Sequence, residues 1–174
     1  KWAQEGNANR TTFGLLGYSR SLAQQSIPYL VVEEEHLNVL SGLKALFLPR
    51  TIVVDEATEK TLAQFVKKGG TLVCESECGA FSSKGFYRYP EDRFTSRLSG
   101  TSEVGRRHVK SDQVIVTIDG QKLNLGVTQW LTPWQNGQGK ILAENSDGAL
   151  ITEVPVGKGK MVLCGAYFGD SYLK

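Results

Sequence analysis

Two strand-like apolar runs flank one amphipathic helix within residues 43–77 of the chain. Ala45–Leu48 is an unbroken apolar run that ends at a proline, as expected for a strand buried on both faces. Asp55 then begins a segment whose apolar residues recur at helical spacing as far as Lys68. A Gly-Gly pair leads into the second apolar run, Thr71–Cys74. The pattern predicts a βαβ unit, and therefore an α/β fold that contains a parallel sheet.

The residues before this unit predict a helix, a strand and a short helical turn. The helix spans about Arg10 to Gln25, the strand is Tyr29–Val32, and the turn runs from His36 to Leu43. An α/β domain of this type begins with a central strand, whereas this chain begins with a helix. We therefore expect the chain to be a fragment of a longer protein whose first strand lies upstream.

The residues after the unit predict a long loop followed by antiparallel strands. The loop covers residues 78–110, and a loop of this length is functional, part of an interface or partly disordered. Asp119-Gly120 separates two apolar runs, which predicts a hairpin. Three further strands are predicted over residues 140–143, 149–154 and 160–164. With no internal repeat, residues 1–174 are predicted to form a single domain.

The composition limits the classes of partner. The chain has 174 residues and a net charge of +2, which is too small to indicate a nucleic acid or a membrane surface. No apolar run approaches the roughly 20 residues of a membrane helix. The three cysteines are expected to be reduced thiols, which favours a soluble cytoplasmic protein over a secreted one but leaves the compartment unknown. No phosphate-binding or dinucleotide-binding glycine motif occurs, and we expect neither a cofactor nor a metal.

Two parts of the sequence resemble a known family. One is the apolar strand ending at Pro49, followed by a helix and by Gly69-Gly70-Thr71-Leu72-Val73. The other is the Gly157-Lys158-Gly159 turn before the last strand. Both are similar to the glutamine-amidotransferase-like trimerisation domain of family-42 glycoside hydrolases, the bacterial β-galactosidases. The resemblance covers residues 13–74 and 139–169. It implies a flavodoxin-like or class I amidotransferase-like open sheet, mostly parallel, with antiparallel hairpins in the C-terminal half.

The resemblance also implies a function. In that family the catalytic glutamates belong to a separate barrel domain, so this chain is expected to be a non-catalytic oligomerisation or accessory domain of a β-galactosidase-like enzyme. Its expected partners are further copies of itself, as in a trimer, or an adjacent catalytic domain. The alternatives are an amidotransferase-like hydrolase that uses a cysteine and a carbohydrate-binding module.

Cys78 is the candidate nucleophile of the first alternative. Related amidotransferases carry a catalytic cysteine on the turn after the comparable strand, where a histidine activates it. Here Ser76 and Ala80 replace the glycines of that turn, and no histidine follows Lys110. We therefore favour a structural thiol.

Glu75 and Glu77 are the other candidates for catalysis. Glu75 and Glu77 are two residues apart, so in an extended segment both side chains face the same side of the chain. Paired carboxylates at a suitable separation hydrolyse glycosides, but a solvated rim is the favoured interpretation. The Glu33–His36 stretch does not point its side chains to one place, so it is interpreted as a solvated charge run rather than a metal site.

Aromatic residues are candidates for binding. Trp130 and Trp134 flank a proline, and Phe86 and Tyr87 lie in the long loop. Aromatic faces stack on sugar rings and also anchor protein interfaces. The competing interpretation is a small satellite core under the loop.

Overall fold

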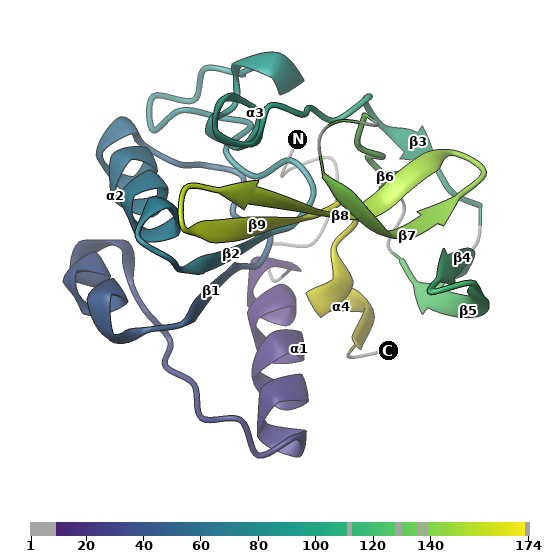
Figure 1. The fold of residues 1–174 in the computed structure, drawn as a ribbon, viewed down its shortest axis with the longest axis horizontal. Helices are drawn as coiled ribbons and strands as arrows, with labels where there is room; N and C mark the ends of the chain where they lie inside the picture. Colours follow the sequence, from purple (N-terminus) through teal and green to yellow (C-terminus); the bar gives the residue numbers. More distant parts are fainter. Residues whose placement is uncertain (1–9, 111–112, 128–129, 136, 138, 173–174) are drawn as a thin grey trace.

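The computed structural model describes residues 10–110, 113–127, 130–135, 137 and 139–172 (Figure 1). The described residues form one seven-stranded sheet with the order β1-β2-β9-β8-β7-β4-β5, and a two-stranded sheet formed by β3 and β6. The strands of the large sheet, in that order, are Ala45–Leu48, Thr71–Cys74, Gly159–Cys164, Gly148–Val156, Lys140–Asn145, Gln113–Ile118 and Gln121–Gly126. Strands β3 and β6 are Arg107–His108 and Trp130–Leu131.

The sheet is mixed, and the prediction of a mostly parallel, flavodoxin-like sheet was wrong. Only the pairings β1–β2 and β2–β9 are parallel, and every other pairing in the large sheet is antiparallel. The C-terminal half joins β4 to β5, β7 to β8 and β8 to β9 by short turns. Such turns can join only antiparallel neighbours, because a parallel pair needs a crossover connection.

The antiparallel half of the sheet curls away from the parallel half. The β7–β8 register shifts between Ile141 and Ala143 and again between Ala143 and Glu144. Such irregularities increase the local twist of a strand pair. In Figure 1, β7, β4 and β5 accordingly turn out of the plane of β1, β2 and β9.

The predicted βαβ unit is confirmed. Helix α2 spans Glu56–Lys67, and the Asp55 carboxylate caps it by accepting a hydrogen bond of 2.7 Å from the backbone N–H of Thr58. Gly69 follows the helix with φ of 122°, a conformation that favours glycine, and the chain then enters β2. The Asp119-Gly120 hairpin and the three late strands are confirmed as well.

The remaining predicted segments differ in part from the structure. Helix α1 (Arg10–Gln24) is confirmed, whereas the turn before β1 is a longer 3₁₀ helix, η1 (Glu34–Gly42). Tyr29–Val32 pairs with no described strand, so the prediction of a strand there was wrong. The 78–110 segment contains η2 (Pro90–Asp92), α3 (Phe94–Ser99) and β3, so it is more regular than predicted.

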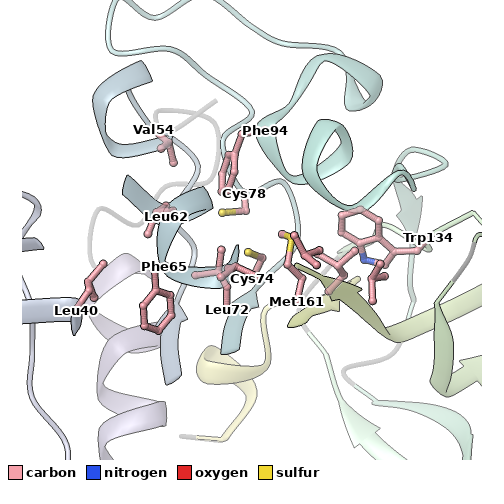
Figure 2. Close-up of a cluster of buried hydrophobic side chains, with 14 of the residues drawn as sticks. Leu40, Val54, Leu62, Phe65, Leu72, Cys74, Cys78, Phe94, Trp134 and Met161 are labelled. Carbon is pink, nitrogen blue, oxygen red and sulfur yellow. The ribbon is translucent and has the colours of Figure 1, made fainter. Parts of the chain in front are cut away.

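Two hydrophobic clusters form the core. The larger lies between α2 and the parallel strands and includes Leu62, Phe65, Leu72 and Met161 (Figure 2). The smaller lies under the antiparallel half, around Leu150. Helix α4 (Phe168–Tyr172) ends the described chain and packs against α1.

The contact between α1 and α4 depends on glycine. A Cβ atom at Gly17 would lie 1.8 Å from the carbonyl oxygen of Gly169. We predict that Gly17→Ala lowers the free energy of unfolding by about 2–3 kcal/mol, because the two backbones must separate. Gly42→Ala is the matched control, since its added Cβ meets no atom within 4 Å. The control should change the stability by less than about 1 kcal/mol in chemical denaturation. Equal effects would contradict the close-packing argument.

Candidate functional site

A buried carboxylate at the end of β2 joins three segments of the chain. Glu75 is 1% exposed. Its Oε1 accepts hydrogen bonds of 2.9 Å from the Tyr18 hydroxyl in α1 and from the Gly169 N–H in α4. Its Oε2 accepts a bond of 2.8 Å from the Arg50 N–H, in the turn after β1. Glu75 therefore fixes both helices against the parallel strands.

A second buried carboxylate, two residues further, faces other partners. The Arg106 side chain donates to Glu77 through Nε at 2.9 Å and Nη2 at 3.0 Å. This bidentate pair fixes the orientation of the guanidinium relative to the carboxylate. The Tyr167 hydroxyl donates to Oε2 at 2.8 Å. Glu77 has φ of 59°, an uncommon conformation for a residue with a side chain. The side-chain carboxylates of Glu75 and Glu77 accept hydrogen bonds from different partners.

Two further ion pairs extend the cluster on either side. The backbone N–H of Glu77 donates to Glu103 at 2.6 Å, and Glu103 pairs with Arg93. On the other side, Arg50 Nη1 lies 2.6 Å from Asp170 Oδ2. The Arg50 guanidinium also lies 4.0 Å from the centre of the Tyr167 ring.

A pocket of about 270 Å³ opens over this cluster. It is lined by Glu77, Tyr87, Pro90, Arg93, Glu103, Gly105, Arg106 and Thr132. Arg93 Nη2 donates to the Tyr87 hydroxyl at 3.0 Å, so one aromatic wall is held by a buried cation. The pocket thus combines an aromatic ring with charged groups that already have partners.

Burial controls the protonation of the carboxyl groups. It raises the pKa of Glu75 to about 6, against the opposing effect of three hydrogen bonds to the carboxylate. It also raises the pKa of Glu103 to about 7, although the charge of Arg93 opposes this. The pKa of Glu77 is raised for the same reason, burial.

The three residues considered for catalysis are all buried. Glu75 and Glu77 are buried rather than on a solvated rim, and they bind different partners. Cys78 is 2% exposed and lies in the core beside Phe94 (Figure 2). Cys74, Cys78 and Cys164 are all buried free thiols.

The two histidines have partners elsewhere in the structure. His36 lies in an exposed pair with Glu33, and His108 packs against Trp130 with ring centres 5.2 Å apart. Within the described ranges, no three His, Cys, Asp or Glu side chains are grouped so that they could hold a metal ion. A search of the same residues finds no helix long and apolar enough to cross a membrane.

The predicted aromatic residues fall into two groups. Trp134 is 2% exposed and belongs to the core, and Trp130 is half-buried, with Arg106 5.2 Å from its ring centre. Phe86 and Tyr87 lie at the surface, 70% and 49% exposed.

Sequence reasoning missed most of the cluster. Arg93 and Glu103 flank α3, whereas Tyr167 and Asp170 lie at α4, and no local pattern links either pair to the end of β2. The only feature of the sequence that could have indicated the buried cluster is the presence of charged residues next to apolar runs. This feature is too common in sequences to identify such a cluster.

The chain matches the family model described as "Beta-galactosidase trimerisation domain" over residues 3–174. No curated protein matches it. Among solved structures, it is similar to Gan42B, a GH42 β-galactosidase from G. stearothermophilus, with a TM-score of 0.80 and 20% identity over 96% of this chain and 25% of that one. A β-galactosidase from Bacillus circulans sp. alkalophilus gives a TM-score of 0.79 and 15% identity, over 94% of this chain and 26% of that one.

A shorter protein has a similar fold. The cytoplasmic protein STM1381 from Salmonella typhimurium LT2 gives a TM-score of 0.60 and 13% identity, over 90% of this chain and 75% of that one. The chain thus spans about a quarter of the β-galactosidases that it matches, and most of this smaller protein. At these identities the structural likeness concerns the fold alone.

We predict that Glu75→Gln lowers the free energy of unfolding by about 2–3 kcal/mol at pH 4.5, because the amide NH₂ meets a backbone N–H and cannot accept from it. The pKa of Glu75 is raised in the folded state to about 6. The stability that Glu75 contributes to the folded protein is therefore complete below the pKa of the unfolded state, 4.5. It is lost as the pH rises through the pKa of the folded state, about 6. The difference between the two proteins should shrink by about 1–2 kcal/mol by pH 7.

The control for this measurement is Glu153→Gln. Glu153 forms a partly exposed pair with Lys160, so its loss should cost less than about 1 kcal/mol at either pH. Urea unfolding at several pH values measures both variants. A Glu75→Gln difference that stays constant from pH 4.5 to 7 would contradict the assigned titration.

Proposed function

The chain belongs to the β-galactosidase trimerisation domain family, and on this premise we propose that it is the non-catalytic domain through which the subunits of a longer glycoside hydrolase associate. Residues 1–174 would act as one domain, and the hydrolytic activity would reside elsewhere in the protein. The match over nearly the whole chain is the observation that carries this proposal.

The state of the polar residues supports a non-catalytic role. A catalytic carboxylate or thiol must reach its substrate, whereas Glu75 and Cys78 are 1% and 2% exposed. Both Glu77 oxygens accept hydrogen bonds from other side chains. These groups therefore act in holding the fold together.

The surface proposed for association is an aromatic one beside the pocket. Phe86, Tyr87 and Tyr89 are 70%, 49% and 65% exposed. The Tyr87 and Tyr89 rings pack edge to face with centres 5.6 Å apart. Aromatic side chains that are held rigid lose little entropy when a partner covers them, which makes them effective anchors of interfaces.

The buried charges hold this aromatic surface in place. Arg93, which donates to the Tyr87 hydroxyl, is itself fixed by its pair with Glu103. Glu103 in turn accepts from the backbone of Glu77. The end of β2 is thereby connected to the surface that a neighbouring subunit would cover.

We predict that Phe86→Ala combined with Tyr89→Ala weakens self-association of the intact protein by at least about tenfold, since anchors of this kind each contribute more than about 1 kcal/mol. The control is Ile115→Ala with Leu123→Ala, on the β4–β5 hairpin, where both residues are exposed. Sedimentation over a concentration series measures both pairs. An unchanged oligomer in the first pair, or equal weakening in both, would contradict the assigned surface.

Carbohydrate binding is the second candidate, supported by the composition of the pocket. Tyr87 offers a partly exposed ring beside the polar groups of Glu77 and Arg106, a combination that suits a sugar ring.

For this candidate we predict that galactose changes the tryptophan fluorescence of the protein, because Arg106 lies against the half-buried Trp130. Tyr87→Ala should remove the change, whereas Tyr172→Ala, an exposed tyrosine of α4, should not. A flat titration with the unmodified protein would reject carbohydrate binding at the pocket, and would leave the association proposal untouched.

A further inference from the structure

Cys74 and Cys78 lie at the two ends of the turn that follows β2. In an extended strand, residues i and i+4 are about 13 Å apart, beyond the Cα separation that a disulfide can bridge. The chain instead turns back here, because the Cys78 N–H donates to the Glu75 carbonyl at 3.3 Å and Glu77 has φ of 59°. The turn therefore brings Cys78 back towards the end of its own strand.

The two thiols lie against each other inside the protein. Both belong to the hydrophobic cluster between α2 and the parallel strands, and Figure 2 shows their sulfur atoms side by side. Burial raises the pKa of Cys74, and a hydrogen bond between the Cys74 and Cys78 side chains raises it further. The fold thus assembles a pair of reduced thiols in contact.

The third cysteine is buried to a similar extent but faces the other side of the sheet. Leu163 of β9 is aligned with Cys74 of β2, so these two side chains share one face. Cys164 is the next residue of β9, and its side chain therefore points to the opposite face. Burial and the nearby Glu75 carboxylate raise the pKa of Cys164. The sheet thus separates Cys164 from the thiol pair.

We propose that Cys74 and Cys78 form a modification site, at which a small disulfide oxidises the two thiols to an intramolecular disulfide bond. One S–S bond forms between the two cysteines, and the S–S bond of the small disulfide breaks. The two thiol protons pass to the two small thiols that are released. The new bond ties the end of β2 to the start of the segment that carries the aromatic surface. The inference does not rest on the association proposed for that surface.

The reaction proceeds through a local opening of the turn. Cys74 and Cys78 are 0% and 2% exposed, so the closed turn excludes reagents. The raised pKa of Cys74 also keeps this group in the less reactive thiol form. Local opening of a turn costs less free energy than global unfolding. Once one sulfur has reacted with the small disulfide, the neighbouring cysteine displaces the small thiol.

Oxidation of the intact protein in a series of ratios of oxidised to reduced glutathione tests the proposal. The remaining thiols are then blocked, and the protein is cut after glutamate residues. Cleavage after Glu75 and Glu77 separates Cys74 from Cys78, and Cys164 lies in a third peptide, so mass spectrometry identifies each link. We expect the Cys74–Cys78 link to be half formed at a ratio at least about tenfold less oxidising than in the urea-unfolded chain, because the fold holds the thiols together.

The unfolded chain is the necessary reference for this measurement. Two cysteines so close in sequence also meet often when the chain is unfolded, so the link alone does not show that the fold favours it. A half-oxidation ratio that is equal in the two states, or more oxidising for the folded protein, would overturn the proposal. A link from Cys164 to either cysteine, or a glutathione adduct as the final product, would overturn it as well.

Two variants separate the thiol pair from the third cysteine. Cys164→Ala is the matched control, since it removes a thiol that is 4% exposed on the other face of the sheet. It should change the half-oxidation ratio by less than about twofold, and a larger change would overturn the proposal. Cys78→Ala should leave Cys74 unlinked in the folded protein. A Cys74–Cys164 link in this variant would contradict the separation by the sheet and overturn the proposal.

Discussion

The position of α1 and α4 on the sheet depends on the carboxylate of Glu75. Three donors from three segments converge on its two oxygens, and all three lose their acceptor if the Glu75 side chain is removed. Burying a charge is unfavourable, and the pKa of Glu75, raised to about 6, reflects that cost. The close approach of Gly17 to Gly169 brings the α4 N–H within reach, so the glycine contact and the carboxylate depend on each other.

The charged groups beyond Glu75 extend this organisation towards the surface. Glu77 links Arg106 and Tyr167, and Glu103 links the Glu77 backbone to Arg93 and so to Tyr87. Buried ion pairs add little net stability compared with apolar packing, but removing one partner is strongly unfavourable. Their role here is to specify one arrangement of an irregular segment.

Local sequence patterns predicted the local structure well and the long-range structure poorly. The Asp55 cap and the Asp119-Gly120 turn depend on neighbours within a few residues, and the βαβ unit depends on segments that follow one another directly in the sequence. All are present. The proportion of parallel pairing depends on which strands meet, and it was predicted wrongly. Glu75 and Glu77 were identified as notable, yet as a solvated rim, because their partners are up to 94 residues away in the sequence. Tyr29–Val32 has the composition of a strand but no described neighbour to pair with.

The same residues that suggest an enzyme in this sequence explain why the domain suits a structural role. A carboxylate or thiol at the end of a parallel strand becomes catalytic when the next turn leaves it open to substrate. Here Cys78, in the turn after β2, lies in the core. Tyrosine and arginine side chains donate hydrogen bonds to the carboxylates of Glu75 and Glu77. Groups held in this way gain rigidity and lose access to substrate. A rigid end of the sheet that displays aromatic rings is consistent with the association surface that we propose.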